Sequence, residues 1–225
     1  MLISTSAASQ EKSSVTQHTL WNRLTIAMPL QKHSFGVLIE NRQYLDRWRH
    51  HIFLSELNHK IKLGNKVTVG THWSYLFFTV PHDPFAEEDE LLHELRPAQS
   101  ISAPLLTKKH FKIFARLMLE ERFFNAKDDS EVYQGYDFTY WRVRKKIGLK
   151  KSITPSIDFY LSEEFMIQSR KGGAFVFDQN RVDLFVRSKI TKNVSLDLGY
   201  LFWYQHRNEI IYSRNSIRTG IFISL

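Results

Sequence analysis

The sequence contains no cysteine and few of the residues that interrupt secondary structure, with 9 glycines and 6 prolines among 225 residues. Without cysteine, the chain has no disulfide framework, no thiolate metal site and no cysteine nucleophile. It also lacks any uncharged stretch approaching the roughly 18 apolar residues that a membrane-spanning helix needs. These absences exclude a disulfide scaffold and a helical membrane protein.

Aromatic residues and positive charge are plentiful. Phe, Trp and Tyr make up 14% of the chain, the apolar content is 43% and the formal net charge is +8. This apolar content argues against disorder, and the length fits one domain. A soluble β-rich domain, a membrane β-barrel and a basic nucleic-acid binder all remain open.

The first residues, 1–18, are interpreted as an N-terminal segment before a single barrel domain at residues 19–225. Residues 1–10 have no basic region, which suits an ordinary N-terminus. The small residues Ala7, Ala8 and Ser9 instead resemble a signal-peptide cleavage site. Two interpretations therefore stay open, an ordinary N-terminus and the remnant of a signal peptide.

Hydrophobic side chains recur with a period of two, which indicates strands with two different faces. In the clearest example, apolar and aromatic residues from Val67 to Phe77 alternate with Gly70, His72 and Ser74. The pattern predicts about eleven strands, at residues 19–29, 34–43, 49–62, 66–79, 90–105, 109–124, 136–150, 156–168, 179–190, 194–206 and 213–225. Pro97 indicates a bulge or break within one of them.

The lengths of these strands and of their connections favour a membrane barrel. Many strands reach or exceed the roughly 9–11 residues of a tilted membrane strand, and short turns alternate with longer loops. We predict an all-β, up-and-down antiparallel transmembrane β-barrel in the bacterial outer membrane. Because single-chain bacterial barrels have an even number of strands, we expect ten to twelve, with twelve as the best estimate.

If the apolar faces meet lipid, the opposite faces carry ten arginines and eight acids into the lumen. Arginine and carboxylate side chains on neighbouring strands are expected to pair there, because an unpaired charge is costly to desolvate. The expected charge network comprises Glu40, Arg42, Glu94, Arg96, Arg116, Glu120, Arg122, Arg142, Arg144 and Arg187. A polar plug is the structural interpretation of this network, and an anion-selective pore is the functional alternative.

Lysines and aromatic residues gather at opposite ends of the predicted strands. Lysines such as Lys108 and Lys109 lie in or beside the short turns, whereas aromatics such as Phe123 and Phe124 lie near the long loops. Aromatic rings at headgroup depth and lysines at the opposite boundary are typical of membrane barrels. Membrane lipids are therefore the expected partners.

Several short motifs carry a resemblance to a known family. They are Glu40-x-Arg42, Glu94-x-Arg96 with Gln99, Arg116-x-x-x-Glu120-x-Arg122, Tyr140-x-Arg142-x-Arg144, Glu163-Glu164, Arg187 and Gly199-Tyr200. On these motifs the chain from about Trp21 onward resembles a bacterial family of outer-membrane β-barrels described as a domain of unknown function. The resemblance implies a barrel and no established activity, so it assigns no catalytic residue.

The sequence gives little support for an enzyme. His72 and Ser74 share a strand face that an acid from a neighbouring strand can reach, but polar residues are expected on that face in any case. His50 and His51 point to opposite faces and cannot chelate one ion together, and no zinc spacing occurs. We expect no enzymatic activity, no metal site and no cofactor.

The two rival classes make different demands on the charged residues. Nucleic-acid binding would need basic and aromatic side chains mixed on one platform, whereas here arginines alternate with acids and lysines are separated from aromatics. A soluble lipocalin-like ligand-binding barrel has the same period but must enclose its apolar face. We therefore predict an outer-membrane barrel with a structural, accessory or narrow transport role, with the soluble barrel as the alternative and no nucleic-acid partner.

Overall fold

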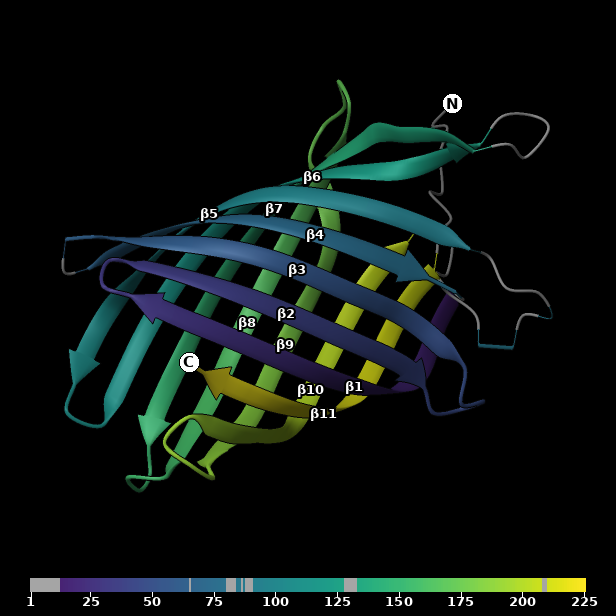
Figure 1. Cartoon of the computed structure of the whole chain (residues 1–225). Coiled ribbons are helices and arrows are strands. Elements are labelled where there is room, and N and C mark those ends of the chain that lie inside the picture. The colour runs from purple at the N-terminus through teal and green to yellow at the C-terminus, as the bar shows by residue number, and fades with distance from the viewer. Residues whose placement is uncertain are drawn as a thin grey trace, which may run out of the picture.

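A computed structural model of the chain describes residues 13–64, 66–79, 84–85, 87, 91–127, 133–207 and 210–225. These residues form a closed barrel of eleven strands, shown in Figure 1. The strands are β1 (Ser13–Leu30), β2 (His33–Tyr44), β3 (His50–Leu63), β4 (Val67–Phe78), β5 (Leu92–Lys108), β6 (Phe111–Lys127), β7 (Tyr133–Ser152), β8 (Ile157–Arg170), β9 (Val176–Lys189), β10 (Val194–Arg207) and β11 (Ile210–Ser224). The described part of the chain contains no helix long and apolar enough to cross a membrane.

The barrel closes between its first and last strands. Sequential strands pair antiparallel around the ring, but β1 pairs with β11 in parallel, from Ser13 beside Ile210 to Ala27 beside Ser224. The all-β barrel and the range of ten to twelve strands are confirmed, and the described residues form eleven strands rather than twelve. An odd number makes the first and last strands of an up-and-down barrel run in the same direction, and parallel pairing still satisfies their backbone hydrogen bonds.

Four strands begin at least three residues earlier than the hydrophobic pattern indicates. β1 begins at Ser13 rather than residue 19, β7 at Tyr133 rather than 136, β9 at Val176 rather than 179, and β11 at Ile210 rather than 213. The mostly polar residues that open β1 pair with β11 inside the closed ring, so they need no apolar face. The cleavage-site resemblance at Ala7–Ser9 lies outside the described residues.

Pro97 interrupts one ladder without ending its strand. It lies opposite Trp73 on β4, but the register between β5 and β6 passes from Leu95–Phe123 to Ala98–Glu120 and leaves Pro97 without a partner on β6. Proline has no backbone N–H to donate to a second neighbour. The break expected at Pro97 is therefore a gap in the pairing of β5 with β6, and the pairing of β5 with β4 continues.

The outer face of the barrel is largely apolar and the inner face is charged. Leu198, Trp73 and Leu57 on the outer face are 65%, 63% and 62% exposed, while many arginines and carboxylates are buried inside. Lys145 and Glu163 are exposed exceptions on β7 and β8. The arrangement is the reverse of what the soluble alternative requires, because a soluble barrel must enclose its apolar face.

Part of the lumen is apolar as well. Buried side chains from β1, β3, β4 and β10 form one hydrophobic cluster, here called the apolar sector, which consists of Trp21, Ile52, Leu54, Leu76, Phe78, Leu201 and Trp203. Phe78, Trp203 and Tyr44 therefore pack inside the barrel, although their positions near the strand ends suggest an interfacial girdle. The distance of a residue from the end of its strand sets its depth along the barrel axis. Whether its side chain points inward or outward depends on whether its position along the strand is odd or even.

Candidate functional site

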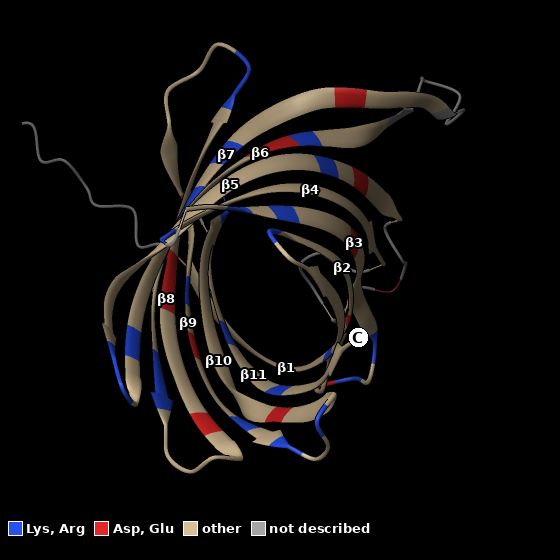
Figure 2. Cartoon of the chain, turned by 60° about the vertical axis from the view of Figure 1, so that its left-hand side comes forward, with Lys and Arg blue, Asp and Glu red and all other residues tan. Residues whose placement is uncertain are grey.

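The lumen is the candidate functional site, and its charges come from positions that face inward on most strands. Figure 2 views the ring of strands more nearly end-on, with Lys and Arg in blue and Asp and Glu in red on the strands as well as on the connections. The sequence places the charges at alternate positions, so strand pairing brings neighbouring charges together on one face. Four clusters result.

The first cluster is centred on Glu40 of β2. Arg23 on β1 lies directly opposite Glu40 in the register, and Arg42 lies two residues farther along β2 on the same face. Both arginines donate to the buried carboxylate: Arg23 Nη2 contacts Oε1, and Arg42 Nη2 contacts Oε2 at 2.7 Å. One carboxylate therefore serves two guanidinium groups.

The second cluster repeats this arrangement around Glu94 of β5, which is fully buried. Arg96 donates through Nε and Nη2 to the two carboxylate oxygens at 2.6 and 2.7 Å. Arg122 of β6 donates to the same two oxygens at 2.5 and 3.0 Å, and its third nitrogen, Nη1, donates to Gln168 at 3.0 Å. Paired two-point contacts of this kind are the strongest arginine–carboxylate geometry and hold both side chains in one orientation.

The third cluster joins β6, β7 and β8. Arg144 on β7 lies between two carboxylates: it donates through Nη1 to Glu120 at 2.5 Å and through Nη2 to Glu164 at 2.7 Å. Arg116 reaches past β7 to Glu164 at 2.6 Å. Alternate strands therefore contact each other directly across the curved inner wall.

Arg142 extends the third cluster toward β9. Its guanidinium lies 2.9 Å from Asp178 and 3.6 Å from Glu120. Asp178 is completely buried. We call the inner wall from β5 to β9 that carries the second and third clusters the charged sector.

The fourth cluster lies on β9, β10 and β11. Arg187 donates through Nε and Nη2 to Asp197 at 2.7 and 2.8 Å. Arg218 contacts Asp183 across one intervening strand and lies 3.5 Å from Asp197. Of the ten residues expected to form the charge network, Arg187 alone belongs to this cluster, and the other nine lie in the first three.

Sequence reasoning missed several charged residues of the lumen. Lys146 and Arg207 line its cavities, and Asp178 and Arg214 are buried in it. Asp178 precedes the expected start of its strand at residue 179. Arg214 lies at the same alternate positions of β11 as Arg218, and this pattern could have identified it. Its hydrogen bonds include those that it donates to the side-chain amides of Gln17 and Gln205, at 2.7 Å each. Gln17 lies before the expected first strand, so no carboxylate pattern marked this group.

Sharing of carboxylates leaves the lumen positive. The Glu40 cluster contains two arginines and one carboxylate, and the Glu94 cluster has the same composition, so each carries a net charge of +1 (two positive charges minus one). Arg181 on β9 adds a further positive charge, with no described carboxylate oxygen within 4.0 Å of its nitrogens. The inward faces carry nearly equal numbers of arginines and acids in the sequence, but guanidinium groups outnumber carboxylates in these parts of the lumen.

Two cavities lie inside the barrel. The larger, of about 150 Å³, is lined by six arginines and Lys146 together with four acids. The smaller, of about 30 Å³, is lined by Arg42, Arg96, Arg122, Arg142, Arg181 and Arg207, and by no described Asp or Glu. Most of the lumen is therefore filled by side chains, and cations outnumber acids among the charged residues that line the remaining open space.

Aromatic rings of the apolar sector contact the guanidinium groups beside these cavities. Arg42 lies 3.6 Å from the ring centre of Trp21, and Arg181 lies 4.5 Å from that of Trp203. The two indole rings are themselves 6.3 Å apart. Such contacts stabilise a guanidinium by the negative face of the ring without neutralising its charge.

His72 participates in a separate hydrogen-bonded relay of β3, β4 and β5. Its Nδ1 lies 2.9 Å from Glu56 and its Nε2 lies 2.9 Å from Ser100, while Ser74 donates to Glu56 at 3.2 Å. Ser100, not Ser74, is therefore the hydroxyl on the other side of the imidazole. Neither Ser100 nor His72 lines either lumen cavity. The relay connects three strands, and Ser100 is half-buried in it. Among the described residues, no group of His, Asp and Glu side chains could hold a metal ion.

Comparison with known proteins defines the family. Residues 18–214 match the model of a family described as "Protein of unknown function (DUF2490)". The chain belongs to this family. No curated protein matches the sequence of this DUF2490 member.

Solved structures resemble the barrel. The NanC porin, in a rhombohedral crystal form, matches with a TM-score of 0.53 and 14% identity over 92% of this chain and 97% of its own. OmpT of Vibrio cholerae, expressed in the outer membrane, has a TM-score of 0.41 and 12% identity over 79% of this chain and 56% of its own. The likeness to NanC shows that this DUF2490 member has a porin-like fold.

Proposed function

We propose that this protein is an integral β-barrel of the bacterial outer membrane whose constricted lumen serves as a narrow passage for small anions. The observation that carries the proposal is the inversion of faces: apolar side chains cover the outside and ion pairs fill the inside. Only a hydrocarbon environment makes that distribution favourable over so much of the surface. Membrane lipids are the proposed partners, and no nucleic acid is.

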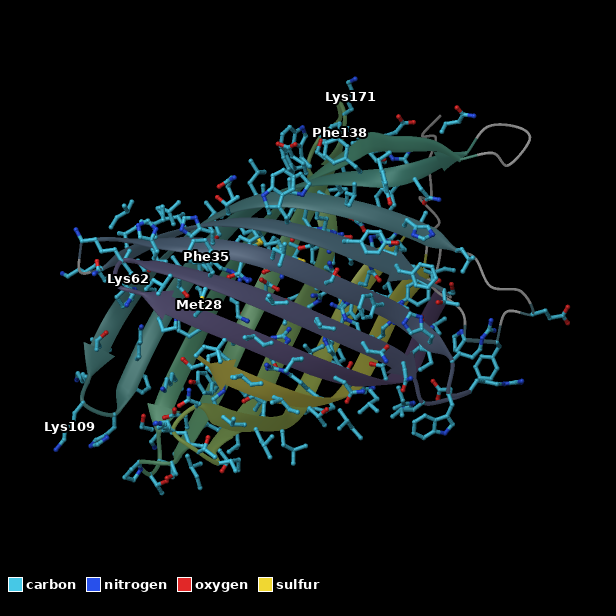
Figure 3. The ribbon with its side chains drawn as sticks, in the orientation of Figure 1. Met28, Phe35, Lys62, Lys109, Phe138 and Lys171 are labelled. Carbon is cyan, nitrogen blue, oxygen red and sulfur yellow. The ribbon has the colours of Figure 1, made fainter. Side chains whose placement is uncertain are left out.

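The two ends of the barrel support this placement. Lys62 and Lys109 both lie at the left, on the short-turn side, away from Phe138, as Figure 3 shows; Lys171, near Phe138, is an exception among the lysines. Other exposed lysines of the short turns are Lys32, Lys66, Lys108 and Lys192. Near the longer connections, Trp48 and Phe175 are 71% and 51% exposed. Lysines at one boundary and aromatic rings at the other suit the two headgroup regions.

Location is tested by fractionating cells and comparing gel mobility of the purified protein with and without heating. We expect recovery with outer membranes and a mobility shift on heating, because a closed barrel resists detergent until it is heated. Recovery in a detergent-free soluble fraction without such a shift would contradict the membrane proposal.

The passage is tested in planar bilayers. Because the cavities are small and arginines outnumber acids in their lining, we expect small current steps with a reversal potential that favours anions over cations. Cation preference would contradict the proposal. A silent bilayer with correctly folded protein would favour a second candidate, a structural or accessory barrel plugged by its own ion pairs, which the clusters that bridge alternate strands support.

A further inference from the structure

The two lumen cavities have three lining residues in common, Arg42, Arg96 and Arg181. These side chains come from β2, β5 and β9, so three separate parts of the wall converge on one constriction. Any solute that moves between the cavities must pass this set of guanidinium groups. The junction is therefore the position in the lumen that most strongly determines which solutes can pass.

The three arginines are not equivalent. Arg42 and Arg96 each donate to a carboxylate, whereas Arg181 donates only to the neutral oxygen of Gln179, at 3.2 Å, among described residues. Its Nε, like that of Arg42, has no hydrogen-bond partner in the part of the chain that the structure describes. Since buried charges are usually paired, an arginine that leaves this capacity unused beside a cavity indicates a site for an anion.

Two further donors lie beside the junction, one on the side of each cavity. Arg181 lies over the rings of both Trp21 and Trp203, at 5.3 and 4.5 Å from their centres. Trp21 lines the larger cavity and Trp203 the smaller, and neither indole Nε1 has a hydrogen-bond partner among described residues. An indole N–H can only donate a hydrogen bond. These two unpaired N–H groups therefore suit an anion as ligand and not a cation.

We propose that the constriction between the two cavities binds one small oxyanion, a carboxylate or phosphate group, through Arg181 with Arg42 and the indole N–H groups of Trp21 and Trp203. The planar fork of a guanidinium matches two oxygens of such a group better than it matches a spherical halide. The inference deepens the proposed function and rests on the passage through the barrel lumen proposed there. The larger cavity, of about 150 Å³, accommodates the remainder of a small solute.

The test titrates the folded full-length barrel in detergent with inorganic phosphate, acetate and chloride, each at matched ionic strength. Calorimetry measures affinity and stoichiometry, and tryptophan fluorescence, to which Trp21 and Trp203 contribute two of the five tryptophans, gives a second binding signal. We expect saturable 1:1 binding of phosphate or acetate, with chloride weaker. Arg181→Gln should weaken binding by roughly 10-fold or more, because it removes a charged hydrogen-bond donor, and Arg181→Lys should give an intermediate loss.

Arg170→Gln is the matched control, because it removes an arginine that is exposed and lines neither cavity. It should bind as the unsubstituted protein does, and heat-dependent mobility checks that every variant is folded. Absence of saturable binding, equal affinity for chloride, or an Arg181→Gln variant that binds normally would overturn the inference. Silent bilayers with intact phosphate binding would contradict the passage alone, so the two failures are distinguishable.

Discussion

The two sectors of the lumen are packed with different kinds of side chain. The charged sector, on β5 to β9, holds Glu94, Glu120 and Glu164 with their arginines, whereas the apolar sector on β1, β3, β4 and β10 packs leucines, aromatics and one isoleucine. Ion pairs impose direction and fail when one partner is removed, while apolar packing is non-directional and fails by leaving a void. Arg42 and Arg181, stacked on the tryptophans, lie where the two sectors meet.

The largest effect is expected from Glu164→Gln in the charged sector. The substitution leaves Arg116 and Arg144 without the carboxylate they share, and breaking a buried pair in this way costs about 3–5 kcal/mol. The free energy of unfolding, measured by urea titration in detergent, should fall by that amount. The adjacent Glu163 is exposed on the outer face, so Glu163→Gln should not lower stability. Equal losses in the two variants would break the distinction between the faces.

A somewhat smaller effect is expected from Leu76→Ala in the apolar sector. Leu76 is 1% exposed, and its truncation leaves a void in the cluster at a cost of about 3 kcal/mol. The same urea titration measures the loss. Leu198→Ala, on the outer face, removes the same atoms from a side chain that is 65% exposed and should cost less. A larger loss in Leu198→Ala would contradict the assignment of Leu76 to a packed interior.

A third loss of stability is expected from the substitution of a glycine that packs against an inward-facing aromatic residue. Gly199 on β10 lies opposite Phe185 on β9, and a Cβ at Gly199 would lie 2.2 Å from the carbonyl oxygen of Leu184. Because backbone atoms cannot yield easily, Gly199→Ala should destabilise the barrel by about 1–3 kcal/mol. Thermal unfolding followed by circular dichroism measures the change. Gly173→Ala, in an exposed turn with room for a Cβ, is the control and should unfold at the unchanged temperature.

The smallest effect is expected from the relay at His72. Ser100→Ala removes one neutral hydrogen bond and should cost about 1 kcal/mol. Because Ser100 lines neither cavity, a fluorophosphonate probe should label neither this variant nor the unsubstituted protein. Labelling that disappears in Ser100→Ala would identify a reactive serine and contradict the structural role of the relay.

Much of the candidate site follows from local pattern. Glu40-x-Arg42 and Glu94-x-Arg96 place two charges on one face because side chains repeat every two residues. Pairing was expected between neighbouring strands, and these two pairs form within one strand. The contact between Arg116 and Glu164 does not follow, since β7 separates the two strands and only the curvature of the ring brings them together. The sharing of Glu40 and of Glu94 by two arginines depends on the register of adjacent strands, as where Arg23 lies opposite Glu40. The junction of Arg42, Arg96 and Arg181, from three separate strands, depends on the curvature.

The sequence by itself determined the strands, the two faces and the segregation of lysines from aromatics, because each depends on position within one strand. The tertiary structure decided the number of strands, the parallel closure through β1 and β11, and the partners of Arg181 and Arg214. It also decided which aromatic residues lie inside, as Trp203 and Phe78 do. These features depend on register and curvature summed around the whole ring, which no local pattern contains.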